Sequence, residues 1–349
     1  MGGVVPASAP AGPYHHLLAR LAGQVPDDLL LRARRLLVDG RTVDVARIID
    51  FAVFAGRLRI PPEDLNLLAE TIRSAGGESA AHGAATAGPA SPPPHAFVVS
   101  PAHPTALPPW PQPVPYGSDL TAADPSGLDD VDRAVGVAAA AAEALGVWRA
   151  WRVPAVATPW PPPRRLYLAQ ADPATDAVLP TVQVRLQEAL AEVEDPVPVV
   201  DVFADPETLP TYHRAVLAVG ALVWAAVPAR PVHVVEATRV DRGDAERLGG
   251  TAREVVVGYL RDGSPLIRSD ELTTDRCDPA RGAVVPTGYR TDGEWVWSEA
   301  VEYYLSEHGV VPERGLLRRV DDLDGIVPEV DAVTTHRALC RLRQHLQEA

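Results

Sequence analysis

The chain has 349 residues, of which 46 % are apolar, and a formal net charge of −14. All 32 basic side chains are arginine, which excludes mechanisms that need a lysine amine, such as Walker A phosphate binding, protein-kinase chemistry and Schiff-base catalysis. Residues 127–349 hold 23 arginines against 35 acids. Because an acidic surface repels phosphate backbones, we expect no nucleic acid as a partner.

Composition also bears on where the protein works. A lysine-free chain rich in arginine and alanine is typical of a very GC-rich genome. Two cysteines, Cys277 and Cys340, are too few for a disulfide framework or a four-cysteine zinc site, so we expect a reduced, cytoplasmic protein without metal or cofactor. The N-terminal residues carry no positive charge ahead of a hydrophobic run, unlike a secretory signal. The apolar run 215–227 has 13 residues, fewer than the roughly 20 of a membrane span. We interpret it as part of a buried helix and expect no membrane partner.

Residues 14–75 show the apolar periodicity of four short helices. The second is expected to begin after Pro26 and to close at Gly40, while the third covers 42–55 and the fourth covers 62–74. About 60 residues make a marginal domain. We therefore predict a small helical domain. Its size is a mild indication that it docks on a partner or on the rest of the chain, and the alternative is a plain helical domain with no partner.

Residues 76–126 are rich in proline, alanine, glycine and serine, which predicts a linker with polyproline character. Within it, HAFVVS at 95–100 is expected to form a short docked strand. Trp110 stands among prolines and is a candidate ligand for an aromatic groove, although such stretches more often act as spacers.

From residue 127 onward the pattern alternates between helix and strand. We predict helices over 128–145, 178–193 and 209–226, and strands over 165–171, 197–204 and 232–238. Strand, helix, strand, helix and strand in succession imply right-handed crossovers. Residues 127–349 are therefore expected to form an α/β domain with a largely parallel sheet, and the stretch that holds Trp148 and Trp151 is interpreted as a crossing.

The first two predicted strands run into the same phrase, ADPAT at 171–175 and ADPET at 204–208. Aspartate followed by proline is typical of a helix start, so capping explains the phrase. The alternative is a ligand or metal site, because Asp172, Asp176 and Asp205 would lie at the carboxyl ends of neighbouring strands.

Residues 283–309 carry the most consistent local signals. Asp292 with Gly293 predicts a hairpin turn, Trp295 and Trp297 then share one strand face, and Ser298 can cap a helix that ends at Gly309. Here the chain resembles a C-terminal module of a protein family of high-GC Gram-positive bacteria, and its TDGEWVW phrase also resembles phrases of some immunity-type proteins. The resemblance implies a structural role and no catalytic residue.

Two further expectations concern this C-terminal part. The two tryptophans of the hairpin are expected to be core residues. Alternatively, they form an interaction surface, for which Tyr303 is a further candidate. The loop 269–278 has four acids around Cys277 but lacks the spacing of a calcium site, so we interpret it as a solvated loop. A reactive thiol is not expected there, because neighbouring acids raise the pKa of a cysteine.

The leading hypothesis is a non-enzymatic interaction or adaptor protein with a protein partner, in which the linker sets the effective concentration of one bound partner near another. One alternative is an enzyme or a small-ligand or metal-binding domain that uses the strand-end carboxylates. Another is an immunity-type protein whose acidic surface binds a basic toxin.

Overall fold

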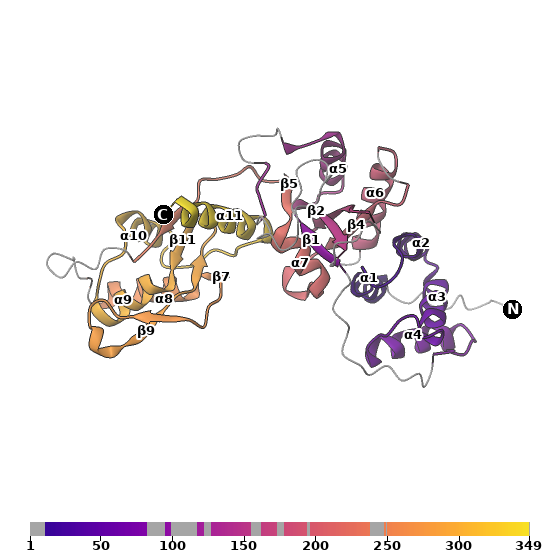
Figure 1. Cartoon of the computed structure of the whole chain (residues 1–349), viewed down its shortest axis with the longest axis horizontal. Coiled ribbons are helices and arrows are strands. Elements are labelled where there is room, and N and C mark those ends of the chain that lie inside the picture. The colour runs from indigo at the N-terminus through magenta and orange to yellow at the C-terminus, as the bar shows by residue number, and fades with distance from the viewer. Residues whose placement is uncertain are drawn as a thin grey trace. The chain divides into compact units, whose positions relative to one another are not determined.

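The computed structural model describes residues 11–81, 95–98, 117–121, 127–154, 162–172, 178–193, 196–237, 248 and 250–348. It divides into two compact units, Met1–Val227 and Pro228–Ala349, here called the first and second unit (Figure 1). Both mix helix and sheet, which confirms the α/β class in its coarse sense. In the described ranges, no helix is both long and apolar enough to cross a bilayer.

The four predicted N-terminal helices are confirmed. They are α1 (Ala11–Arg20), α2 (Asp27–Val38), α3 (Thr42–Phe54) and α4 (Pro62–Ser74). Acidic residues occupy the first turns of α2 and α4, where they favour the helix dipole. Gly40 and Gly56 follow the ends of α2 and α3 with positive φ, a conformation that stops a helix at little cost in glycine.

The sheet of the first unit has the strand order β1-β2-β3-β4, and β5 pairs with β2 beyond the end of β1. The strands are β1 (His95–Val98), β2 (Gly146–Pro154), β3 (Arg164–Gln170), β4 (Val199–Phe203) and β5 (Ala221–Ala225). The helices α5 (Asp130–Ala141) and α6 (Leu179–Ala191) pack on one face in a single apolar cluster. A 3-10 turn, η3 (Pro206–Thr208), and α7 (Thr211–Val219) lie between β4 and β5.

Three expectations for this sheet were wrong. It is not largely parallel, because among its five described strands only β3 and β4 pair in parallel. The expected crossing around Trp148 and Trp151 is the central strand β2. The expected helix 209–226 stops at Val219, and β5 follows after Gly220, because an apolar run fits either element and pairing with β2 selects the strand.

The helices α1 and α2 cover the outer edge of strand β4. The imidazole of His15 lies with Nε2 2.8 Å from the carbonyl oxygen of Val202, while Arg34 donates to the carbonyl of Val200 at 3.1 Å. Gln183 on α6 donates to the same Val200 carbonyl at 2.6 Å. These side chains satisfy carbonyls that a neighbouring strand would otherwise bind, so the edge of the sheet is closed by helices.

The second unit contains a four-stranded sheet of order β6-β11-β10-β7 and a separate β8–β9 pair. Its strands are β6 (His233–Val235), β7 (Ser264–Ile267), β8 (Leu272–Thr274), β9 (Ala283–Pro286), β10 (Tyr289–Thr291) and β11 (Trp295–Ser298). Its helices are α8 (Gly250–Asp262), η4 (Pro279–Arg281), α9 (Glu299–His308), α10 (Arg314–Asp322) and α11 (Ala332–Glu348). The expected strand 232–238 is thus β6 of this second sheet, where it runs parallel to β11.

The hairpin and helix of the C-terminal part are confirmed, with one correction. Strands β10 and β11 pair antiparallel, and Thr291 faces Val296 across the turn. Of the two expected turn residues only Gly293 has a positive φ, of 94°. Asp292 instead accepts hydrogen bonds at Oδ1 from the backbone of Glu294 and Trp295, so its side chain holds a four-residue turn together.

The expected boundaries of the helical domain (14–75), the linker (76–126) and the α/β domain (127–349) stay predictions. Most of residues 76–126 lie outside the described ranges. The structure adds a division at Val227, and it places the first four helices in the same compact unit as the sheet β1–β5.

Candidate functional site

The structure places two of the three strand-end carboxylates at the same edge of the first sheet. Gln170 pairs with Phe203 at the ends of the parallel strands β3 and β4, and Asp172 and Asp205 each follow two residues later. Both side chains are exposed. Asp205 accepts a hydrogen bond from the backbone N–H of Glu207 at 2.9 Å, so it caps η3 as expected. Asp176 lies outside the described residues, as does Trp110.

The aromatic residues expected as core or as an interaction surface differ in burial. Trp297 is fully buried, and its Nε1 donates to the carbonyl of Leu260 at 3.1 Å. Trp295 packs partly buried against the same apolar cluster and stacks on His233, with ring centroids 4.6 Å apart. Tyr303 is half-buried and donates its hydroxyl to Asp275. Trp297 therefore acts in the core, while Trp295 and Tyr303 keep some exposed surface.

An exposed aromatic pair on α3 was not expected from the sequence. Phe51 is 67 % exposed and Phe54 is 61 % exposed, and residues three apart on a helix are neighbours on its surface. Arg47 lies one turn before Phe51, Arg57 lies three residues after Phe54, and both are exposed. We call these four residues the α3 face. A possible signal was that residues 42–54 are apolar around most of the helix, more than one buried face requires.

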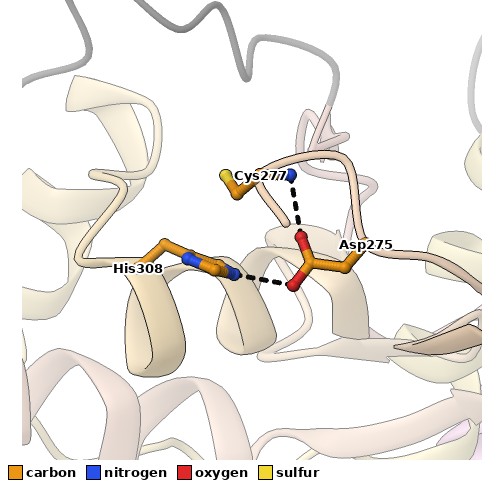
Figure 2. Close-up of side chains that lie close together, drawn as sticks. All are labelled: Asp275, Cys277 and His308. Carbon is orange, nitrogen blue, oxygen red and sulfur yellow. Dashed lines mark hydrogen bonds and ion pairs between the residues drawn. The ribbon is translucent and has the colours of Figure 1, made fainter. Parts of the chain in front are cut away.

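A second group of side chains gathers around Asp275, which follows strand β8. The expectation of a solvated loop was wrong at this residue, because Asp275 is 0 % exposed. Its Oδ2 accepts from the Tyr303 hydroxyl at 2.9 Å and lies 2.7 Å from Nε2 of His308, the last residue of α9. Its Oδ1 accepts from the backbone N–H groups of Cys277 at 2.8 Å and Asp278 at 3.1 Å. Figure 2 shows the carboxylate between the histidine ring and the Cys277 loop.

These contacts also set the charge of the cluster. Burial alone would raise the pKa of Asp275, but hydrogen bonds from His308, the Asp278 amide, Tyr303 and the Cys277 amide lower it to about 2. The carboxyl is therefore ionised at neutral pH. Burial and the hydrogen bond to Asp275 raise the pKa of Tyr303 to about 12, so the phenol stays a neutral donor.

The same cluster contains three different potential metal ligands. One carboxylate oxygen of Asp275, Sγ of Cys277 and one ring nitrogen of His308 all lie within 4.8 Å of one another. In the part of the chain that the structure describes, no other group of three such ligands occurs, so Asp172 and Asp205 belong to none. Cys277 is not in a disulfide. Sequence spacing could not show this group, because His308 stands 31 residues beyond Cys277.

Comparison with protein-family models, curated proteins and solved structures gives no match for this chain. The resemblance of residues 283–309 to a module of high-GC Gram-positive bacteria therefore stays a prediction. The function must be inferred from the geometry of the chain's own residues.

Proposed function

We propose that the protein is a non-enzymatic protein-binding or adaptor protein whose α3 face binds an acidic, amphipathic segment of another protein. The observation that supports this proposal is the exposed pair Phe51 and Phe54 on one helix. Single exposed apolar residues are common on protein surfaces, but two adjacent phenylalanines flanked by arginines have the composition of an interface centre. Aromatic and arginine side chains are also the residues that most often dominate binding energy.

The exposed apolar area of the aromatic pair is large enough to bind a short segment of a partner. A phenylalanine that is about two-thirds exposed leaves roughly 100–150 Å² in water, so the pair offers about 200–300 Å² of apolar surface. At about 25 cal/mol per Å², covering it contributes about 5–7 kcal/mol before the costs of association. An amphipathic helix that places apolar side chains on this pair fits these dimensions.

The charge of the α3 face selects the chemistry of the partner. Within the described ranges, no carboxylate forms a salt bridge with Arg47 or Arg57, whereas Arg41 at the start of α3 is paired with Asp44 at 2.7 Å. The two flanking guanidinium groups can therefore bind carboxylates of a partner. The α3 face is basic, whereas the chain as a whole is acidic. An acidic apolar segment is thus favoured over a basic one.

The proposal is tested by selecting peptides from a displayed random library with the full-length, untagged protein. We expect the selected peptides to be acidic and amphipathic, and to lose at least about 30-fold in affinity for the variant F51S/F54S, which corresponds to the loss of one strong anchor. The matched control is V137S, because Val137 on α5 is 73 % exposed. This variant should bind as the wild type does.

Several outcomes would contradict the proposal. Peptides that are basic, or that bind F51S/F54S as tightly as wild type, would show that the α3 face is not the site. Dimerisation of the wild type that F51S/F54S abolishes would make a second copy of the chain the occupant instead. An adaptor role further requires a second partner on the second unit, which the same selection performed with F51S/F54S as the target would reveal.

A further inference from the structure

We propose that Asp275, Cys277 and His308 bind a zinc-class divalent cation, with a fourth position open to water or to a ligand atom of a partner. This site is independent of the α3 face, because it lies wholly within the second unit. The three side chains come from two places in the chain. Asp275 and Cys277 belong to the loop after β8, and His308 ends α9. Figure 2 shows the three ligands on one side of this loop.

The donor set fits zinc better than calcium or magnesium. A thiolate, an imidazole and one carboxylate oxygen are the ligands that Zn²⁺ takes, whereas hard cations require six or more oxygens or several waters. Three protein ligands and one open position are typical of zinc sites that keep a bound water. Cys277 and His308 are only partly buried, so a cation has access from solvent.

The spacing of the ligand atoms requires little movement. Zinc bonds of about 2.0 Å to nitrogen and oxygen and about 2.3 Å to sulfur place tetrahedral ligands roughly 3.3–3.5 Å apart. The three ligand atoms already lie within 4.8 Å of one another, and His308 Nε2 is 2.7 Å from Asp275 Oδ2. Side-chain rotation can therefore bring Sγ closer and open the histidine–carboxylate contact by about half an ångström.

Surrounding groups orient two of the three ligands, Asp275 and His308. The backbone amides of Cys277 and Asp278 fix Oδ1 of Asp275, and the Tyr303 hydroxyl contacts Oδ2. The ring of Tyr304 packs against His308, with centroids 6.0 Å apart. Hydrogen bonds of this kind orient metal ligands and are worth about 10–100-fold in metal affinity where they have been removed.

The nearby arginine does not neutralise the cluster. Arg281 Nη1 lies 3.7 Å from Asp275 Oδ2, but its Nη2 donates to Glu307 at 2.8 Å. Asp275, Glu307 and Arg281 together therefore carry one net negative charge, which favours a cation. On binding, the thiol of Cys277 releases its proton to solvent, and the ring nitrogen of His308 that binds the cation carries no proton.

The test is a titration of the full-length, untagged, metal-free protein with Co²⁺, which takes the same ligands as Zn²⁺ and is coloured. We expect a thiolate-to-metal charge-transfer band, visible bands of tetrahedral intensity, saturation at a single ion, and displacement by Zn²⁺. Variant C277S should lose the charge-transfer band, and H308Q should bind at least about tenfold more weakly. Glutamine can still donate to Asp275, so H308Q keeps the loop while it removes the ligand.

The chain offers a matched control in its other cysteine–histidine pair. Cys340 Sγ lies 3.4 Å from His336 Nε2, but the described residues give this pair no third metal ligand within reach. Variant C340S should therefore bind Co²⁺ as the wild type does. Far-UV circular dichroism verifies that each variant is folded. The proposal is wrong if the wild type shows no charge-transfer band in several-fold excess of Co²⁺, or if the band survives in C277S and disappears in C340S.

Discussion

The buried contact between Arg34 and Asp201 carries the sharpest stability prediction. Arg34 on α2 donates to the Asp201 carboxylate and to the carbonyl of Val200, and both side chains are about 5 % exposed. The change Arg34→Met keeps a long apolar side chain but removes the charge and the donors. Asp201 then keeps only His213, at 3.1 Å, and Gln183, at 3.5 Å, as polar partners among the described side chains. We expect the first unit to lose about 3–5 kcal/mol, the usual cost of breaking a buried ion pair from one side.

The pH dependence of this loss can also be predicted. Burial by itself raises the pKa of Asp201, and the charges of Arg34 and His213 overcome that effect and lower it. Without Arg34 the folded pKa rises above the unfolded value of about 3.9. A carboxyl whose pKa is higher in the folded than in the unfolded state destabilises the folded state at high pH. This loss of folding free energy becomes smaller as pH falls. The cost of R34M should therefore be largest near neutral pH and smaller toward pH 4.

The assay is urea unfolding of the full chain combined with hydrogen exchange of peptides that cover α2 and β4, because the two units can unfold separately. Arg32 is exposed on the same helix, so R32M is the control and should stay within about 0.5 kcal/mol of wild type. The double variant R34M/D201N should recover most of the loss, since it leaves no unpaired charge. A cost below about 1 kcal/mol for R34M would refute the packing of α2 on the edge of β4.

Three further predictions follow from single buried side chains. Burial lowers the pKa of His15 to about 4 against the opposing hydrogen bond to Val202, so the folded state holds a neutral ring. The first unit should lose about 3 kcal/mol as pH falls from about 6.5 to about 4, and H15Q should remove this slope in urea titrations. Trp297→Ala should cost the second unit about 3–5 kcal/mol in thermal unfolding, because the ring is fully buried. The pKa of Asp275 is lowered to about 2, so this carboxylate stabilises the second unit above about pH 4, and the contribution is lost as pH falls toward 2. In acid titrations followed by circular dichroism, D275N should not show this loss.

Each of these predictions has an outcome that would contradict it. An unchanged pH slope in H15Q would place the titration on another group. A cost of W297A no larger than that of W295A would contradict the burial difference between the two tryptophans, since Trp295 is only partly buried. Equal acid sensitivity of D275N and wild type would show that the Asp275 carboxyl contributes nothing to the loop.

The sequence correctly predicted helices whose first and last residues are marked by capping residue types. Ser298 accepts from the Ala300 amide and Gly309 closes α9 with a φ of 67°, as the residue types indicated. Long-range pairing decided the elements that the sequence mistook. The run 215–227 is apolar enough for a buried helix, yet β5 forms there because the backbone of Ala221–Ala225 pairs with β2, more than 70 residues earlier in the sequence.

The candidate sites escaped prediction for a related reason. Asp275 looked like one acid among several in a polar loop, and its role depends on Tyr303 and His308, which α9 brings to it. The strand-end carboxylates were easier to place, because the repeated phrase follows two strands that do pair in parallel. Their spacing along the chain indicated a shared edge of the sheet, but exposure and the capping bond of Asp205 could be learned only from the structure.

Asp201 and Asp275 are both buried carboxylates, but they differ in how their charge is balanced, and this difference separates a structural role from a binding role. Asp201 is matched by the full charge of Arg34 in a dry site, so a cation has nothing to neutralise there. Asp275 accepts from two backbone amides and the Tyr303 hydroxyl and contacts His308, while the guanidinium of Arg281 also donates to Glu307. Its negative charge is stabilised but not cancelled. A divalent cation bound between Asp275 and His308 would therefore neutralise the charge of Asp275. At Asp201 a cation would gain nothing of this kind, because Arg34 already balances the carboxylate.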